Sequence, residues 1–202
     1  MARTPQFNRE TALNNAMSLF WRKGYHATSM KDIEQAMDMR PGSIYAAFGS
    51  KERLFGEALA VYGESTKASF SAALSEGDTE LAGFVQLLQN IVEPKIQGNT
   101  PSKACMLIKT LLELSNHQTL NNEPVKNYMN ELQQLFEVKF CRAIAAGELA
   151  PRADAKRLAR LYQSNILGLS VMSQRDLPND QLKQLADDIC QQILPASAVL
   201  NV

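Results

Sequence analysis

Residues 24–54 read GYHATSMKDIEQAMDMRPGSIYAAFGSKERL, and this pattern predicts two short helices joined by a tight turn. Ser29 and Asp32 have the spacing of a capping box, in which each side chain bonds the backbone N–H of the other residue. Thr28 is an alternative cap at the same place. A short helix is therefore expected from Met30 to Met37.

A second short helix is expected to start near Arg40-Pro41 and to end by Phe48-Gly49. Asp38-Met39 supplies the turn before it, and proline is tolerated in the first turn of a helix because an N–H there has no intrahelical partner. Ile44 and Phe48 lie four positions apart and are expected to point inward. The two helices form a helix-turn-helix, in which the first braces the second so that its exposed face can enter a DNA major groove about 12 Å wide.

The outward face of the second helix holds the candidate DNA contacts. These residues lie opposite the inward pair, and they are Arg40, Pro41, Gly42, Ser43, Tyr45 and Ala46. Ala46 and Ala47 offer no hydrogen bond, but a methyl group can still touch the methyl group of a thymine.

The same segment resembles the TetR family of transcriptional repressors. Residues 24–33 match the family pattern G-(F/Y)-x-x-T-(S/T)-x-x-x-I, and residues 42–54 match G-(S/T)-(L/I)-Y-x-x-F-x-(S/N)-K-(E/D)-x-L. The resemblance is dense over roughly the first 60 residues, and beyond them only the helical layout agrees. It implies a DNA-binding domain over residues 1–50 and a ligand-binding and dimerisation domain over residues 51–202.

The resemblance also implies roles for single residues. Thr28 would contact a DNA phosphate while capping a helix, Tyr45 would reach the DNA backbone or a base, and Lys51 would pair with a phosphate. Each has a simpler alternative: a plain helix cap, an ordinary half-buried aromatic and a solvated surface lysine. The sequence departs from the family in two places, since Arg40 stands where Ser or Thr is common and Ala47 where many members have His.

Helical spacing of apolar residues continues along the rest of the chain, and strand-like alternation is absent. The sequence therefore predicts an all-α protein of nine helices, with an N-terminal three-helix DNA-binding domain and a C-terminal helical domain. The expected ranges are 8–23, 30–37, 40–48, 51–74, 79–96, 102–116, 123–146, 154–175 and 180–194.

Composition sets weaker limits on function. The 202 residues are 45% hydrophobic, enough for a buried core, and the net charge is zero. Residues 1–55 nevertheless hold eight Lys and Arg against five Asp and Glu, a modest basic excess where DNA contact is expected. No apolar stretch approaches the roughly 18 residues of a membrane span, and no signal peptide is evident. Three widely separated cysteines suit reduced thiols, so a cytoplasmic protein is expected.

The resemblance implies that the helices of residues 51–202 enclose a ligand pocket. Candidate pocket residues lie on their apolar stripes: Tyr62, Phe84, Leu88, Cys105, Met106, Tyr128, Tyr162 and Asn165. Asn165 is notable because it is polar within an apolar stripe, and a buried amide needs a hydrogen-bond partner. The alternative is that most of these side chains are ordinary core.

A homodimer through the last two helices is also implied, because two recognition helices are needed to span two half-sites related by a twofold axis. Gly168, flanked by Ser164 and Val171, offers a strip of small residues for close packing. Residues 182–193 form a regular apolar stripe that suits the same use. The alternative is that this stripe packs on its own monomer.

Cys105 is the cysteine with a candidate chemical role. It is expected in the first turn of the helix at residues 102–116, with Lys103 before it and Lys109 four positions later. A helix N-terminus and nearby cations favour the reactive thiolate. Residues 104–109 also resemble a Gly-Cys-Leu-type motif of one TetR subgroup, some members of which sense electrophiles or oxidants through this cysteine. The alternative is a small residue that fills a gap.

Together these features predict a ligand-responsive repressor that is released from twofold operator DNA by a small molecule or by a reactive electrophile or oxidant. A thiol enzyme is the first alternative, but the sequence has no P-loop, GxGxxG or nucleophile elbow, and His117 is a poor base for Cys105. An activator or adaptor with the same fold is the second. No enzyme activity and no cofactor are expected, and His26 and His117 lack the spacing of a metal site.

Overall fold

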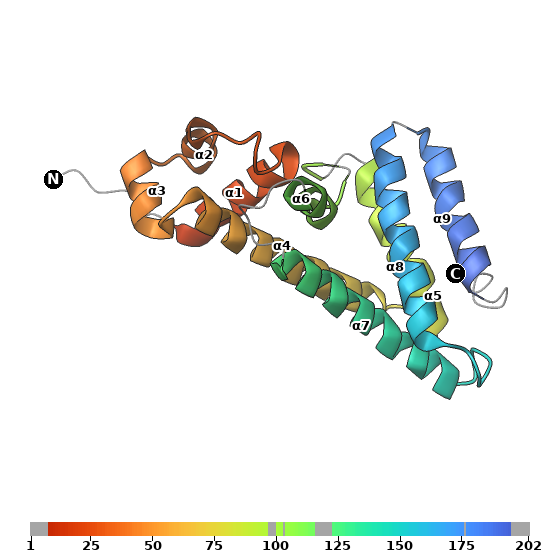
Figure 1. Ribbon diagram of the computed structural model, residues 1–202. Helices are drawn as coiled ribbons and strands as arrows, with labels where there is room; N and C mark the ends of the chain where they lie inside the picture. Colours follow the sequence, from red (N-terminus) through yellow and green to blue (C-terminus); the bar gives the residue numbers. More distant parts are fainter. Residues whose placement is uncertain (1–7, 97–99, 103, 116–122, 176, 195–202) are drawn as a thin grey trace. The chain divides into compact units, whose positions relative to one another are not determined.

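The computed structural model describes residues 8–96, 100–102, 104–115, 123–175 and 177–194. These residues form nine α-helices and one short 3-10 helix, with no strand among them. Figure 1 shows how the α-helices follow one another along the chain. The α-helices are α1 (Arg9–Lys23), α2 (Met30–Met37), α3 (Pro41–Phe48), α4 (Lys51–Ala73), α5 (Glu80–Ile96), α6 (Met106–Ser115), α7 (Glu123–Ala145), α8 (Ala155–Met172) and α9 (Asn179–Ile193). The predicted all-α fold with an N-terminal helix-turn-helix is confirmed.

The chain divides into two compact units. The first combines Met1–Glu64 with Met106–Val125, and the second combines Ser65–Cys105 with Lys126–Val202. This division falls inside α4 and assigns α6 to the first unit, whereas the sequence placed the boundary after residue 50. The assignment of DNA binding and ligand binding to the two parts of the chain remains a prediction.

Aromatic side chains form the centre of the first unit. Phe20 of α1 and Phe55 of α4 meet edge to face with ring centroids 5.0 Å apart, and the Tyr25 ring lies 4.9 Å from Phe55. Ile33 of α2 and Ile44 of α3 complete this core and are 0% and 3% exposed. Since burying such a side chain contributes about 1.5–3 kcal/mol, the apolar faces of these short helices hold them together.

Local hydrogen bonds fix both ends of α2. Ser29 Oγ accepts from the Asp32 N–H at 3.2 Å and Asp32 Oδ2 accepts from the Ser29 N–H at 2.8 Å, which confirms the predicted capping box. A hydrogen bond from Lys23, at 2.7 Å, is the main reason that the pKa of Asp32 lies well below its usual range. At the other end Asp38 adopts a left-handed φ of 50°, and its N–H donates to the Glu34 carbonyl, so the chain turns sharply towards α3.

The second unit is centred on stacked aromatic rings from three helices. Phe84 of α5 stacks on Phe140 of α7 with ring centroids 4.0 Å apart, and Tyr162 of α8 lies edge-on to Phe84 at 4.7 Å. The Tyr162 hydroxyl donates to the Phe84 carbonyl at 2.5 Å, which satisfies the polar group of a fully buried ring. Burial raises the pKa of Tyr162 well above its usual value, so this hydroxyl stays a donor.

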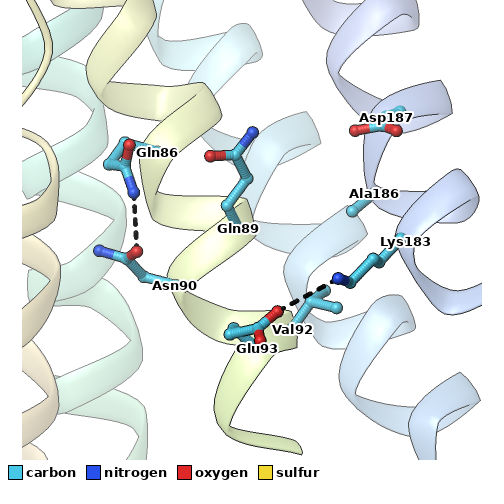
Figure 2. Close-up of a pocket in the computed structure, with 8 residues that line it drawn as sticks. All are labelled: Gln86, Gln89, Asn90, Val92, Glu93, Lys183, Ala186 and Asp187. Carbon is cyan, nitrogen blue, oxygen red and sulfur yellow. Dashed lines mark hydrogen bonds and ion pairs between the residues drawn. The ribbon is translucent and has the colours of Figure 1, made fainter. Parts of the chain in front are cut away.

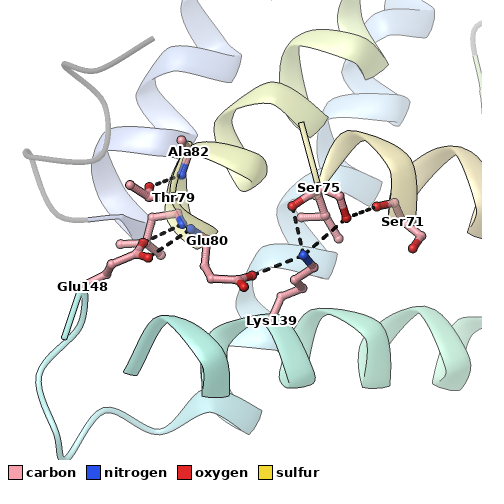
Figure 3. Close-up of polar contacts among 9 residues, drawn as sticks. Ser71, Ser75, Thr79, Glu80, Ala82, Lys139 and Glu148 are labelled. Atoms are coloured by element: carbon pink, nitrogen blue, oxygen red, sulfur yellow. Dashed lines mark hydrogen bonds and ion pairs between the residues drawn. The ribbon is translucent and has the colours of Figure 1, made fainter. Parts of the chain in front are cut away.

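Lys139 and Glu148 stabilise the corner between α4 and α5 (Figure 3). The Nζ of Lys139, on α7, donates to the Leu74 carbonyl at 3.1 Å and lies 3.2 Å from a carboxylate oxygen of Glu80. Just beyond α7, the Glu148 carboxylate accepts from the N–H groups of Glu80 and Leu81 at 3.0 and 2.8 Å. The Lys139 ammonium therefore lies at the C-terminal end of α4, and the Glu148 carboxylate lies at the N-terminal end of α5. The helix dipoles favour both placements.

Helix α6 begins later than the sequence predicted. The expected start was Ser102, but the helix begins at Met106. Ser102 Oγ accepts a hydrogen bond from the Ala104 N–H at 3.3 Å, and a serine turn of this kind competes with helix formation. Cys105 therefore precedes the helix instead of lying in its first turn. The predicted end of this helix, at Asn116, lies outside the described residues.

The end of α8 also differs from the prediction. The α-helix stops at Met172, and residues 173–175, which were expected to continue it, form a 3-10 helix. The Ser173 hydroxyl donates to the Ser170 carbonyl at 2.8 Å, three residues earlier, and so helps to tighten this last turn.

Candidate nucleic-acid interface

Helix α3 is anchored on one face and open on the other. Its inner residues Ile44 and Phe48 are 3% and 1% exposed, as the sequence predicted. The predicted contact residues are all exposed, namely Arg40, Pro41, Gly42, Ser43, Tyr45 and Ala46. A Cβ atom added at Gly42 would meet nothing within 4 Å, so a ligand can approach the backbone closely there. The face that was expected to enter a DNA groove is therefore the accessible face of a fixed helix.

Arg40 and Tyr45 are the two large side chains on this face. Arg40 stands at the N-cap of α3 but makes no side-chain hydrogen bond to the helix, and its side chain is exposed. Its guanidinium carries five N–H donors, which suits a guanine edge or a phosphate. Tyr45 is 50% exposed and carries a hydroxyl that can donate to DNA. Both side chains are accessible on the face of α3 that was expected to contact DNA.

Lys51 begins α4 and lies against an aromatic ring. Its Nζ is 4.3 Å from the centroid of the Tyr25 ring, a cation–π geometry that restrains the ammonium. Burial lowers the pKa of Lys51, and the three carboxylates of Glu52, Glu113 and Asp32 oppose that shift. Burial also raises the pKa of Tyr25 to about 12, with a further contribution from Glu52. Lys51 is therefore a positioned cation and not a freely solvated one.

Thr28 does not cap α2, although the sequence suggested that it does. The residue is 1% exposed, and its hydroxyl donates to the Gly24 carbonyl at 2.6 Å. The residue that caps α2 is Ser29, so the capping role predicted for Thr28 is wrong. The hydroxyl instead satisfies a carbonyl at the end of α1, where the helix has no backbone partner to offer. Because its side chain is buried and its hydroxyl is engaged, Thr28 is not among the proposed DNA contacts.

The predicted ligand residues are divided between the two compact units. In the first unit, Tyr62 meets the Trp21 ring edge to face at 4.9 Å, and Met106 is 1% exposed. The second unit holds the other six: Cys105, which directly precedes α6, and five residues of α5, α7 and α8, which are Phe84, Leu88, Tyr128, Tyr162 and Asn165. Phe84, Leu88 and Tyr162 are each 0% exposed, so they are core residues whatever further role they have. Ligand binding by these residues stays a prediction.

Asn165 is not the buried amide of α8. It is partly exposed, and its Nδ2 donates to the Leu161 carbonyl one turn earlier at 2.8 Å. The buried amide is Gln163, which is 9% exposed and donates through Nε2 to the Met129 carbonyl at 2.8 Å. Sequence reasoning missed Gln163, although its position three residues before the buried Ile166 was a signal of the inner face.

Cys105 directly precedes α6, and the Lys109 ammonium that was expected near it bonds other groups. Cys105 is partly exposed. The Nζ of Lys109 donates to the carbonyl oxygens of Trp21 and Arg22, at 2.7 and 3.0 Å, so that ammonium is engaged with the end of α1. Lys103 lies outside the described residues. The expectation that Cys105 sits in the first helical turn is wrong, and its role as a sensor stays a prediction.

A groove between α5 and α9 has a polar lining (Figure 2). Its volume is about 410 Å³, and it is lined by Gln86, Gln89, Asn90, Val92, Glu93, Lys183, Ala186 and Asp187. Gln86 donates to Asn90 Oδ1 at 2.8 Å, and Lys183 lies 3.5 Å from Glu93. None of the predicted ligand residues lines this groove, so it is distinct from the expected pocket.

Helix α8 has an exposed strip of apolar and small residues. Leu161 and Val171 are 44% and 50% exposed, and Ser164 and Gly168 between them are exposed as well. A Cβ atom added at Gly168 would meet nothing within 4 Å. The apolar stripe of α9 behaves differently, because its residues are buried in the chain itself; they are Leu182, Ala186, Ile189, Cys190 and Ile193. The exposed strip of α8 is thus the better candidate for contact with a second copy.

The described residues contain neither a metal-binding cluster nor a membrane-spanning helix. Within the described ranges, no group of three or more His, Cys, Asp or Glu side chains is placed to hold a metal ion. His117 lies outside these ranges. None of the described helices combines the length and apolar character needed to cross a membrane.

Comparison with known proteins places this geometry among transcription regulators. Residues 12–58 match the family model described as "Bacterial regulatory proteins, tetR family". The chain is 31% identical over 188 residues to the HTH-type transcriptional repressor ComR of Escherichia coli strain K12, which covers 89% of this chain and 86% of ComR. It is 28% identical over 193 residues to the HTH-type transcriptional repressor DhaR of Mycobacterium sp. strain GP1, covering 90% of each chain.

A solved structure extends the similarity to nearly the whole chain. The TetR family transcriptional regulator CifR, as a cysteine mutant complexed with 26-base-pair double-strand operator DNA, matches with a TM-score of 0.84 and 31% sequence identity. The match covers 96% of this chain and 100% of that chain. The similarity therefore includes the helices that follow the helix-turn-helix.

Proposed function

This chain belongs to the TetR family of bacterial regulatory proteins, and from that membership we propose that it is a ligand-responsive transcriptional repressor. In this proposal a homodimer binds two half-sites of operator DNA. A small molecule, or a reactive electrophile or oxidant, then releases the dimer from the DNA. The repressor acts in the cytoplasm, where its operator is, and uses no cofactor.

The exposed face of α3 carries this proposal. Arg40, Ser43 and Tyr45 present hydrogen-bond donors there, while buried Ile44 and Phe48 keep the helix in place. Base edges in the major groove give sequence specificity, and phosphate contacts give position and much of the affinity. We assign base-edge contact to the residues of α3. We assign phosphate contact to Lys51, whose ammonium is fixed over the Tyr25 ring.

A dimer through α8 and α9 would present two copies of α3 to one duplex. The exposed strip formed by Leu161, Ser164, Gly168 and Val171 supports this arrangement, since small residues let two helices approach closely. In an interface related by a twofold axis the same strip serves both protomers. The operator is accordingly expected to contain two related half-sites.

Release follows from unequal affinity for two conformations. An effector that binds one conformation better shifts the population towards it, and operator affinity falls if that conformation holds the recognition helices at the wrong spacing. The electrophile or oxidant version of the proposal relies on Cys105, which is partly exposed and directly precedes α6. The relative CifR was solved with operator DNA as a cysteine mutant, which motivates a test of this residue.

The first test is selection of binding sites from random double-stranded DNA by the purified full-length protein. We expect a motif with two related half-sites, bound by two protomers with a Kd of about 10 nM or tighter at physiological salt. A scrambled duplex should bind about a thousandfold more weakly, and both affinities should fall as salt rises. Equal and weak binding to every sequence would contradict the proposal.

The second test separates the two kinds of effector. N-ethylmaleimide should release the wild-type protein from the selected operator but should not release a Cys105→Ser variant. Cys141→Ser is the matched control, because Cys141 is exposed and should not be needed for release. If alkylation of Cys105 leaves operator binding unchanged, the electrophile version is wrong, and the search narrows to small molecules that bind without forming a covalent bond.

A further inference from the structure

Two side chains of α6 hold the end of α1 and the loop that leads into α2. The Nζ of Lys109 donates to the carbonyl oxygens of Trp21 and Arg22, at 2.7 and 3.0 Å. One turn further along α6, Glu113 Oε2 accepts the backbone N–H of Tyr25 at 2.9 Å. These contacts all lie within the first compact unit and join residues 87 or 88 positions apart in sequence.

The backbone at this junction is shaped to admit the two side chains. Gly24 has a φ of +85°, and a Cβ atom added there would lie 1.9 Å from Glu113 Oε1. Glycine is therefore favoured by the backbone conformation, and its lack of a side chain leaves the space that the Glu113 carboxylate occupies. The carbonyls bonded by Lys109 belong to the last turn of α1, where they lack intrahelical partners and where the helix dipole favours a cation.

The contact made by Glu113 reaches the proposed phosphate-binding residue through Tyr25. Glu113 holds the Tyr25 backbone, and the ring of Tyr25 lies 4.3 Å below the Lys51 ammonium. Glu113 also acts on Lys51 electrostatically, because it opposes the lowering of the Lys51 pKa by burial. The Glu113 carboxylate therefore contacts the Tyr25 backbone and also stabilises the charge of the Lys51 ammonium.

We propose that Lys109 and Glu113 are positioning residues for the DNA interface, an inference that rests on the proposed repressor function. By holding the junction between α1 and α2, they place Tyr25 and therefore Lys51 for contact with a phosphate. The two side chains lie one turn apart on α6 and therefore hold the same junction.

Positioning and simple charge predict opposite effects at Glu113. DNA is a polyanion, so the loss of a nearby carboxylate, taken as charge alone, should tighten binding. Loss of the acceptor that holds the Tyr25 N–H should instead weaken binding. Glu113→Gln removes the charge but keeps an acceptor oxygen, whereas Glu113→Leu removes both. Comparing the two variants separates the two effects.

The experiment measures binding of full-length variants to the selected operator. Glu113→Gln should bind at least as tightly as the wild type, and Glu113→Leu should bind about tenfold more weakly because a charge-assisted hydrogen bond is lost. The double variant Glu113→Leu with Lys51→Met should bind the operator no more than about twofold more weakly than Lys51→Met alone. The two losses in affinity are not additive because both residues act through one contact. Lys109→Met should weaken binding, and Lys109→Arg, which keeps the donors, should restore it.

Hydrogen exchange of single amides provides a readout that does not depend on DNA. The Tyr25 amide should be protected in the wild type and in Glu113→Gln, and should exchange quickly in Glu113→Leu, while the amides of α5 and α8 remain unchanged. If Glu113→Leu does not fold, two measurements still test the proposal. They are protection of the Tyr25 amide in the wild type and the difference in operator affinity between Lys109→Met and Lys109→Arg.

Four outcomes would overturn the inference. In the first, both Glu113 variants bind the operator more tightly than the wild type; in the second, the affinity losses of Glu113→Leu and Lys51→Met add fully in the double variant. In the third, the Tyr25 amide of the wild type exchanges quickly; in the fourth, Lys109→Met binds as tightly as the wild type. A wild-type protein without sequence-selective binding would overturn the proposed function itself. That case is distinguishable, because the Tyr25 amide would still be protected.

Discussion

Lys51 illustrates how its surroundings turn a common surface residue into a candidate DNA contact. A lysine on a flexible stem loses side-chain entropy when it binds a phosphate. Here the Tyr25 ring already restrains the ammonium at 4.3 Å, and nearby carboxylates favour its charged form. Part of the side-chain entropy that a phosphate contact would cost is therefore already lost in the folded protein before DNA binds.

Replacing Lys51 by methionine should weaken binding to operator and scrambled DNA by a similar factor, because phosphates are common to both. The slope of log Kd against log salt concentration should fall by about 0.9, as expected for one lost phosphate contact. Lys126→Met is the control, since Lys126 is an exposed lysine of the second compact unit. An unchanged slope in Lys51→Met would show that Lys51 does not meet a phosphate.

The cysteines should differ widely in reactivity. Cys190 is 3% exposed, and burial raises its pKa to about 12, whereas Cys141 is exposed. Because only the thiolate reacts, iodoacetamide at pH 8 should modify Cys141 at least about 100-fold faster than Cys190 in the native protein. Mass spectrometry of digested samples measures both rates, and in denaturant the two rates should converge. Similar native rates would contradict the burial of Cys190.

At the scale of helices, the boundaries follow local hydrogen bonds more closely than apolar spacing. The capping box of Ser29 and Asp32 starts α2 at the predicted residue. By contrast, apolar spacing suggested that α6 starts at Ser102, but the Ser102 side chain bonds the Ala104 N–H and delays the start to Met106. A side chain that can bond the nearby backbone therefore decides where a helix begins.

The corner between α4 and α5 should depend strongly on Lys139. Lys139→Met removes the donor to Leu74 and leaves the Glu80 carboxylate without its cation, so we expect a loss of about 2 kcal/mol in the free energy of unfolding. Urea unfolding followed by circular dichroism measures the loss. Adding Glu80→Gln should recover part of the stability, because the uncompensated charge is removed. Equal stability of Lys139→Met and the wild type would contradict a structural role for the ammonium.

At the scale of the whole molecule, the exposed strip of α8 has no evident use within one chain. Leu161 and Val171 are 44% and 50% exposed, and Gly168 lies between them with open space at its Cβ position. Apolar side chains exposed in a row on one helix commonly mark an interface. A repressor that reads two half-sites needs such an interface, so the strip and the DNA-binding face are parts of one proposal.

Gly168→Arg should shift the protein from dimer to monomer, because a long charged side chain would stand where two helices approach. Sedimentation equilibrium measures the mass, and operator affinity should fall at the same protein concentrations at which the dimer is lost. Gln134→Arg, at an exposed position of α7, is the control that adds the same charge outside the proposed interface. A Gly168→Arg variant that remains a dimer would exclude this strip as the interface.

The sequence by itself determined the helix-turn-helix, because its signals act within a few residues. The cap at Ser29, the proline at position 41 and the inward pair Ile44 and Phe48 each depend on neighbours along the chain. The exposed face of α3 follows from the same spacing, so most of its candidate DNA contacts could be predicted from the sequence.

Only the tertiary structure decided which charged residues hold the elements together. Lys139 meets a carbonyl 65 positions away, and Lys109 and Glu113 meet the junction of α1 and α2 from up to 88 positions away. In the sequence these residues look like ordinary polar positions on amphipathic helices. Local spacing cannot distinguish them, because the partner that stabilises each charge is brought near only when the helices pack.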